Sequence, residues 1–186
     1  MFIRPLHRVL ACLFSLSLLT LGAQAQEWRR SEAGVTLNDV FMTSATSGWV
    51  VGEGGVIRRT TDGGATWQFQ SSGTSEPLYE VFFLNGTTGW VAGGNSAGQI
   101  LRTTDAGATW QVATISSGPV VMYGLHFIDA STGWAVGGYP TGIYKTTNGG
   151  VTWTAQTAGT SQALNDVHFT DASTGWAVGD VGTLLK

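Results

Sequence analysis

Short apolar stretches separated by glycine-rich turns recur along most of the chain. Four stretches of similar composition are each followed by a Gly-Trp pair, and they occupy residues 37–42, 78–83, 122–127 and 164–169. The tryptophans of these pairs are 41, 44 and 42 residues apart, at Trp49, Trp90, Trp134 and Trp176. Because glycine recurs throughout and no stretch keeps a 3.6-residue period, the pattern predicts short antiparallel β-strands and no helices.

A second motif lies between successive copies of the first. It reads Thr-Thr-Asp-Gly-Gly-x-Thr-Trp with small variations, at residues 60–67, 103–110 and 146–153. One unit therefore contains an apolar inner strand, a Gly-Trp strand, a third strand that ends in a basic residue, the Thr-Thr-Asp turn and an outer Trp strand. Four short antiparallel strands in about 43 residues are the content of one β-propeller blade. We therefore expect an all-β fold, a β-propeller of four-stranded antiparallel blades with about four blades present.

The repeat also predicts the domain boundaries. Residues 26–36 are an orphan outer strand, because Trp28 aligns with Trp67. Either four units close on themselves, or the chain is a fragment of a larger ring. We favour the fragment, since terminal repeats normally carry capping changes and the sequence at Lys186 shows none. The predicted units are three complete blades and a fourth that stops before its outer strand: 37–73, 74–117, 118–160 and 161–186.

The first 25 residues have the order of a secretory signal peptide. A basic start with Arg4 and Arg8 precedes a short apolar run, and a small-x-small cleavage site ends at Ala25. We predict cleavage there, export to the periplasm or the extracellular space, and a mature domain of residues 26–186 without a membrane span; an uncleaved anchor is the alternative. Cleavage also removes Cys12, the only cysteine, so no disulfide is expected.

Composition and charge exclude some classes of function. Charged residues make up only 11% of the chain, which has 27 glycines and 8 tryptophans, and this composition suits an all-β fold rather than disorder. The formal net charge is −3. Since no block of like charge occurs, we expect no nucleic-acid partner.

The Thr-Thr-Asp turns resemble the Asp-box, also called the bacterial neuraminidase repeat. In such a turn a short Asp or Asn side chain accepts hydrogen bonds from backbone N–H groups, a glycine takes positive φ, and the tryptophan packs between sheets. Asn148 stands where the other copies have Asp, so we interpret the turns as structural rather than catalytic, with calcium binding as the alternative. The set comprises Asp62, Gly64, Trp67, Asp105, Gly107, Trp110, Asn148, Gly150 and Trp153.

The two motifs together resemble those of the photosystem II assembly and stability factor-like propeller family, over the whole chain after the signal peptide. Residues 164–179 carry the first motif in full, from the inner strand through Gly175-Trp176. The resemblance implies an exported, seven-bladed propeller that binds protein and is not an enzyme, of which about four blades are present here. In phototrophs such proteins help to assemble photosystem II in the thylakoid lumen.

Basic residues recur at one position of the repeat. Four of the seven that follow the signal peptide end the third strand of a unit, and Arg58 adjoins the first of them. A propeller would display them once per blade, as an arc of positive charge that docks an acidic or membrane-protein segment or a carboxylate; the resemblance also implies a basic patch for a partner. The alternative is a solvated strand position beside the Asp-box carboxylates. The candidate partner-binding residues are Arg58, Arg59, Arg102, Lys145 and Lys186.

Two histidines also share one repeat position, on the inner strands. His126 and His168 could ligate a metal, but Phe41 and Phe82 occupy the same position elsewhere, and two ligands do not make a closed zinc site. We therefore interpret the position as core or channel lining, and expect no metal and no cofactor.

An enzyme would need the carboxylates of the inner strands. Asp39, Glu80 and Asp166 share one repeat position, which Gly124 interrupts, and two of them could pair as in glycosidases. Tyr79 and Glu80 would point to opposite faces of a strand, which does not suit a nucleophile pair. The leading hypothesis is a non-enzymatic protein-binding assembly factor. The alternatives are an Asp-box glycan-binding protein or sialidase-like glycoside hydrolase, and a structural module of a longer cell-surface protein.

Overall fold

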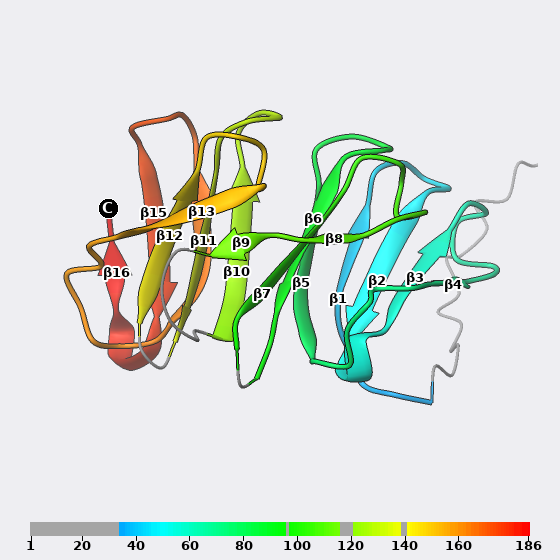
Figure 1. Cartoon of the computed structure of the whole chain (residues 1–186), viewed down its shortest axis with the longest axis horizontal. Helices are drawn as coiled ribbons and strands as arrows, with labels where there is room; N and C mark the ends of the chain where they lie inside the picture. The colour runs from blue at the N-terminus through cyan, green and yellow to red at the C-terminus, as the bar shows by residue number, and fades with distance from the viewer. Residues whose placement is uncertain (1–33, 96, 116–120, 139–140) are drawn as a thin grey trace, which may run out of the picture. The chain divides into compact units, whose positions relative to one another are not determined.

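The computed structural model describes residues 34–95, 97–115, 121–138 and 141–186. These residues belong to one compact unit, Ala33–Lys186, and they form four small sheets (Figure 1). The predicted signal peptide of residues 1–25 and the predicted outer strand at Trp28 lie outside the described residues. The expectation of an all-β chain is confirmed, because the only helical elements in the described part are the 3-10 turns η1 (Glu53–Gly55) and η2 (Asp180–Gly182).

Apart from one added strand in the third sheet, described below, the strands of each sheet follow the order of the chain and pair antiparallel with their neighbours. The first sheet comprises β1 (Leu37–Met42), β2 (Gly48–Gly52), β3 (Ile57–Thr60) and β4 (Gln68–Gln70). The second comprises β5 (Leu78–Phe83), β6 (Gly89–Gly93), β7 (Gln99–Thr103) and β8 (Gln111–Val112). The third comprises β10 (Val121–Phe127), β11 (Gly133–Gly138), β12 (Gly142–Thr146) and β13 (Thr152–Gln156). The fourth comprises β14 (Leu164–Phe169), β15 (Gly175–Gly179) and β16 (Leu184–Leu185).

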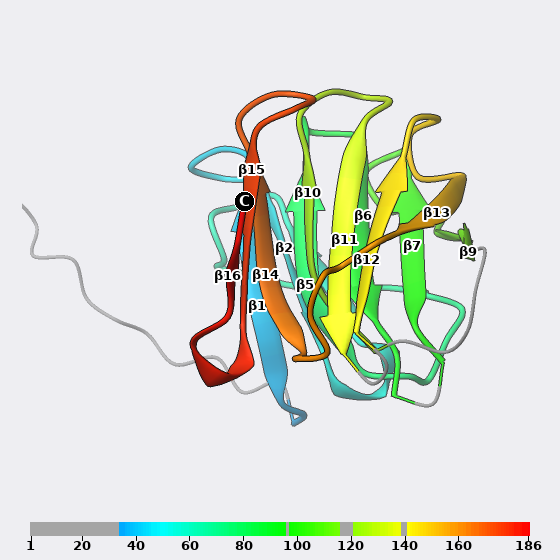
Figure 2. The same ribbon diagram turned by 90° about the vertical axis from the view of Figure 1, so that its left-hand side faces the viewer.

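The four inner strands lie next to one another. β1 contacts β5, β5 contacts β10, and β10 contacts β14. The sheets therefore stand side by side with their inner strands as neighbours, as Figure 2 shows from the end that carries β14 to β16. The Gly-Trp strands β2, β6 and β11 are buried at every residue, because each packs against neighbours on both of its faces. This position explains why they consist of small and apolar residues.

Packing explains why each Gly-Trp strand begins with a glycine followed by a tryptophan. A Cβ on Gly89 would lie 2.5 Å from the ring of Phe83, and one on Gly133 would lie 2.6 Å from the ring of Phe127. The glycine thus makes room for the phenylalanine that ends the inner strand of its own unit. The tryptophan that follows reaches the next unit, where Trp90 stacks on Phe127 with ring centroids 3.5 Å apart.

Two features of the sheets differ from the regular pattern that the sequence predicts. Thr114–Ile115 form an additional strand, β9, which pairs in parallel with β13 and adds a fifth strand to the third sheet. The register of each inner strand also shifts near its start, for example between Leu78 and Glu80. This β-bulge breaks the simple alternation of faces.

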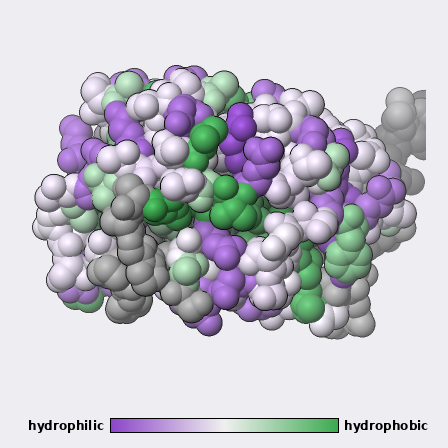
Figure 3. All heavy atoms as spheres, viewed as in Figure 1, coloured by the Kyte–Doolittle hydropathy of each residue, from purple (hydrophilic) through white to green (hydrophobic). Residues whose placement is uncertain are grey.

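The side of the molecule seen in Figure 1 exposes apolar residues near its middle, as Figure 3 shows. β8 and β9 cross this region, and Val112 of β8 is 62% exposed.

Candidate functional site

The Asp-box turns hold themselves together through side chains only a few residues apart. In the first turn Oδ1 of Asp62 accepts hydrogen bonds from Thr60 Oγ1 at 2.8 Å and from the Thr66 backbone N–H at 2.9 Å, and its Oδ2 accepts one from Thr66 Oγ1 at 2.6 Å. The backbone N–H of Gly64 donates to Thr60 Oγ1 at 2.8 Å. The second turn repeats these contacts around Asp105 at the same distances. Gly64, Gly107 and Gly150 all have positive φ.

These hydrogen bonds lower the pKa of Asp62 and of Asp105 to about 2, first through the Thr66 and Thr109 hydroxyls and then through their backbone N–H groups. A carboxylate with such a pKa neither donates nor accepts a proton near neutral pH. Asn148 makes the same contact with the backbone, since its Oδ1 accepts from the Thr152 N–H at 3.0 Å. The geometry fits turns that serve the fold. No group of three or more metal-ligating side chains occurs within the described part of the chain.

The Asp-box tryptophans meet the phenylalanine at the end of their own inner strand. The ring of Trp110 lies edge-on to Phe83 at 6.1 Å, and that of Trp153 lies edge-on to Phe127 at 5.6 Å. Trp153 is buried in an apolar cluster that includes residues of the preceding sheet. Trp110 is partly buried and packs against the corresponding cluster, and Trp67 is also partly buried. The indole Nε1 atoms of Trp110 and Trp153 are buried and find no hydrogen-bond partner among the described residues.

The Gly-Trp tryptophans, which the sequence marks only as a strand motif, connect one sheet to the next. Trp49 stacks on Phe83 at 3.6 Å, and its Nε1 donates to the carbonyl of Ala106 at 3.3 Å. Trp90 repeats the arrangement toward the third sheet, with Nε1 donating to the carbonyl of Gly149 at 2.9 Å. The second and third Asp-box turns therefore each receive the indole of the preceding unit.

The recurrent basic side chains lie directly beside these tryptophans. Arg59 pairs with Trp49 across β2 and β3, and its guanidinium carbon lies 5.3 Å from the centre of the indole. The Nζ of Lys145 lies 4.8 Å from Trp134. A cation over an indole at such distances is a cation–π contact.

The other three candidate basic residues, Arg102, Lys186 and Arg58, also lie beside aromatic side chains. Arg102 pairs with Trp90 in the sheet, and the Nζ of Lys186 lies 5.9 Å from Trp176. The guanidinium of Arg58 lies 4.1 Å over Phe69, a side chain that is 69% exposed. Arg58, Arg59, Arg102 and Lys145 are half-buried, and Lys186 is exposed. The carboxylates of Asp62 and Asp105 accept hydrogen bonds within their own turns.

The inner strands carry a row of rings. Phe41 lies 5.3 Å from Phe82, Phe82 lies 5.4 Å from His126, and His126 lies 4.3 Å from His168. Nδ1 of His126 accepts a hydrogen bond from the Phe169 N–H at 3.3 Å. Burial lowers the pKa of His126, and the charge of His168 lowers it further. The two histidines continue a row of packed aromatic rings, which fits the lining that the sequence predicts.

The acidic position of the inner strands joins neighbouring units. Oδ2 of Asp39 accepts a hydrogen bond from the Val81 N–H at 2.9 Å, and burial raises the pKa of this carboxyl. Glu80 accepts a hydrogen bond from the backbone N–H of Leu125 in the same way. Burial is the main cause that raises the pKa of Glu80 to about 8, and the negative charges of Asp166 and then Asp39 add to it. Tyr79, by contrast, packs beside the ring of Tyr123 at 5.5 Å. Tyr79 and Glu80 thus serve different contacts.

The fold and these contacts define an all-β repeat protein whose motifs serve mainly to pack one unit on the next. Residues 22–156 match the family described as photosynthesis system II assembly factor YCF48. The chain belongs to this family.

Two solved structures share the fold. The structure of "YCF48 bound to D1 peptide" superposes with a TM-score of 0.54 at 18% identity, covering 81% of this chain and 64% of that chain. YCF48 from Cyanidioschyzon merolae gives a TM-score of 0.57 at 20% identity, covering 81% of this chain and 66% of that chain. The four sheets therefore match about two thirds of the length of these relatives. A comparison with curated proteins found no match, and no helix in the described part is long and apolar enough to cross a membrane.

Proposed function

We propose that this chain is part of an exported, non-enzymatic β-propeller that binds an acidic protein segment and acts in the assembly of a larger complex. The proposal includes the finer features that the sequence predicts: blades of residues 37–73, 74–117, 118–160 and 161–186 belonging to a seven-bladed ring, and export through a signal peptide of residues 1–25. Membership of the YCF48 family supports an assembly role. One solved relative is "YCF48 bound to D1 peptide", which supports a protein segment as the ligand.

The observation that carries the proposal is the recurrent basic side chain beside the Gly-Trp tryptophan. These side chains are Arg59, Arg102, Lys145 and Lys186. The first three pair in their sheets with Trp49, Trp90 and Trp134, and Lys186 lies beside Trp176. At Arg59 and Lys145 the cationic group lies over the indole, and both side chains remain partly exposed. Cations held in a row at fixed spacing suit an extended, acidic segment.

A glycoside hydrolase is less well supported. The Asp-box carboxylates, with a pKa of about 2, are occupied by their turns, and the inner-strand carboxyls accept hydrogen bonds from neighbouring strands. Hydrolysis of a sialoside by the purified protein would contradict a non-enzymatic role.

The proposal is tested by capture of a labelled D1 peptide. The triple variant Arg59→Gln, Arg102→Gln, Lys145→Gln removes the charge and should weaken capture at least about tenfold, because three ion contacts are lost. The variant Arg59→Lys, Arg102→Lys keeps both charges and is the matched control, which should retain capture. Binding by the wild type should weaken as salt is raised from 50 to 300 mM, values chosen to shorten the Debye length from about 14 Å to about 6 Å. Equal capture by the Gln variant would contradict the basic-position proposal.

A further inference from the structure

Neighbouring inner strands are tied by a hydrogen bond from the backbone of one strand to a side chain of the strand before it. Between the first and second sheets the Val81 N–H donates to Oδ2 of Asp39 at 2.9 Å. Between the second and third sheets the Leu125 N–H donates to the carboxyl group of Glu80. Both acceptors are carboxyl groups at one repeat position. We call these contacts the inner-strand ties.

The tie between the third and fourth sheets uses a different side chain. Gly124 stands at the carboxyl position, and a Cβ added there would lie 2.8 Å from the Cα of Asp166, so β10 and β14 approach too closely for a side chain at this point. The Val167 N–H donates instead to Oδ1 of its own neighbour Asp166 at 2.7 Å. The tie is made two residues further along β14, where the Phe169 N–H donates to Nδ1 of His126 at 3.3 Å.

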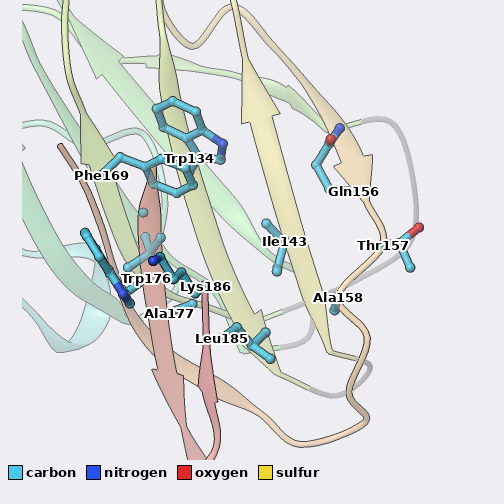
Figure 4. Close-up of a pocket in the computed structure, with 12 residues that line it drawn as sticks. Trp134, Ile143, Gln156, Thr157, Ala158, Phe169, Trp176, Ala177, Leu185 and Lys186 are labelled. Carbon is cyan, nitrogen blue, oxygen red and sulfur yellow. The ribbon is translucent and has the colours of Figure 1, made fainter. Parts of the chain in front are cut away.

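The repeat shows what the histidine adds to its position. Phe41 and Phe82 occupy that position in the first two units, and a phenyl ring offers no acceptor to a backbone N–H. His126 keeps the ring packing, since its centroid lies 5.4 Å from that of Phe82, and adds a hydrogen-bond acceptor. Phe169 is thereby held twice: its N–H reaches His126, and its ring stacks on Trp134 at 3.6 Å, as Figure 4 shows.

An imidazole can accept this hydrogen bond only in its neutral form. With the proton on Nε2, Nδ1 has a lone pair for the Phe169 N–H, whereas in the protonated ring both nitrogens carry hydrogen and two donors would face each other. A carboxyl group keeps an acceptor oxygen in either charge state. Of the three described ties, therefore, only the one made by His126 is broken by adding a proton.

The surroundings of His126 keep the ring neutral at neutral pH. Burial lowers its pKa below the ordinary value of 6.5, the charge of His168 lowers it further, and Asp166 opposes both. The tie is therefore complete above pH 6.5 and is lost as the pH falls through the lowered pKa. Asp166 attracts the protonated ring and lies on β14 as well, so it offers that ring a second partner. Other ionisable residues of the strands in contact with β10 are Tyr79 and Glu80 of β5 and Arg102 of β7.

We propose that His126 is a pH-sensitive switch between the third and fourth sheets: at neutral pH it ties β14 to β10 through the Phe169 N–H, and in mild acid the protonated ring releases this N–H and turns toward Asp166. The release loosens the backbone that carries the ring stacked on Trp134. The tie made by Glu80 stays closed over the same range, because this carboxyl keeps its proton until about pH 8. The switch is independent of the basic-position proposal, since it needs no bound partner.

The first experiment follows hydrogen exchange of single backbone amides in the full chain by NMR, from about pH 7 to about pH 5. Each rate is divided by the rate of an unfolded chain at the same pH, which gives a protection factor. The protection of the Phe169 amide should fall about fivefold to tenfold on acidification, the equivalent of one lost hydrogen bond. The Leu125 amide is the internal reference and should keep its protection. Constant protection of Phe169, or an equal loss at both amides, would overturn the proposal.

The second experiment changes the histidine. His126→Asn keeps an acceptor oxygen near the place of Nδ1 and cannot titrate, so the Phe169 amide should stay protected at both pH values. His126→Phe carries the side chain of the first two units and should leave this amide weakly protected at both. His168→Asn is the matched control: the pH dependence should persist with its midpoint at higher pH, because the charge that opposes protonation of His126 is gone. A pH dependence in His126→Asn equal to that of the wild type would overturn the switch.

A third measurement uses the wild type alone and does not depend on how the variants fold. Ring nitrogen shifts of His126 report its tautomer and its titration directly. We expect the Nε2–H tautomer at pH 7 and a titration midpoint below 6.5 that coincides with the loss of protection at Phe169. An Nδ1–H tautomer at pH 7, or a midpoint that does not match the exchange data, would overturn the proposal.

Discussion

The indole Nε1 of Trp90 donates a hydrogen bond to the backbone carbonyl of Gly149, 2.9 Å away, across the boundary between the second and third sheets. The same indole stacks on Phe127 at 3.5 Å. One side chain therefore fixes both the inner strand and the Asp-box turn of the next unit.

Replacing this indole by a phenyl ring should reveal the contribution of the hydrogen bond. Trp90→Phe keeps an aromatic ring but leaves the Gly149 carbonyl unsatisfied, so we expect a loss of about 2 to 3 kcal/mol in the free energy of unfolding. Trp153→Phe is the matched control, because Nε1 of Trp153 is buried and has no partner among the described residues. Its loss should be smaller by about 1 kcal/mol. Urea unfolding followed by circular dichroism measures both, and equal losses would contradict the role given to the hydrogen bond.

Acid should destabilise the Asp-box turns in a defined pH range. The folded pKa of Asp105 is about 2, below the ordinary value of 3.8, so its contribution to stability is present above pH 4 and is lost as the pH falls from about 4 to 2. Asp105→Asn should remove this part of the pH dependence while keeping the turn, because Asn148 makes the same backbone contact in the third unit. Unfolding midpoints measured between pH 6 and pH 2 test this. An unchanged pH profile in the Asn variant would contradict it.

Glu80 should make the protein less stable as the pH rises. Burial raises its folded pKa to about 8, so the unfolded chain loses the proton near pH 4.5 while the folded chain keeps it. Stability should therefore fall between about pH 4.5 and pH 8 and stay constant above that range. Glu80→Gln keeps an acceptor for the Leu125 N–H without a charge, and should raise the free energy of unfolding at pH 8 by roughly 2 to 4 kcal/mol. A carboxyl titration followed by NMR would show the pKa directly, and a value near 4.5 would contradict the prediction.

One residue of the fourth sheet has an unfavourable backbone conformation. Val181 lies in η2 with φ of 54° and is 89% exposed, and a β-branched residue at positive φ is strained. Gly54 occupies the same position in η1 with φ of 66°, and a Cβ added there would meet no heavy atom within 4 Å. Val181→Gly should stabilise the protein by about 1 kcal/mol, and Gly54→Val should destabilise it by a similar amount. Thermal unfolding of the two variants checks both signs.

The sequence was sufficient to predict the features that depend on neighbouring residues. The hydrogen bonds of Asp62 span at most four residues, so the Thr-Thr-Asp motif already predicts them. The inner and Gly-Trp strands were predicted for the same reason, because alternating apolar residues and flanking glycines act locally. The bulge near Glu80 was not predicted, since nothing in the alternation marks where the pairing register shifts.

The tertiary structure decided what the repeated residues do between units. Every unit carries the same Gly-Trp pair and the same inner-strand aromatic position, so the sequence could not show that Trp49 reaches Phe83 and Ala106 of the following sheet. It also marked Arg59 as a surface charge, whereas packing places its cation over Trp49. The repeat by itself determined the strands and turns, because those depend on contacts close in the chain. The contacts between sheets depend on how whole units pack, which only the folded structure shows.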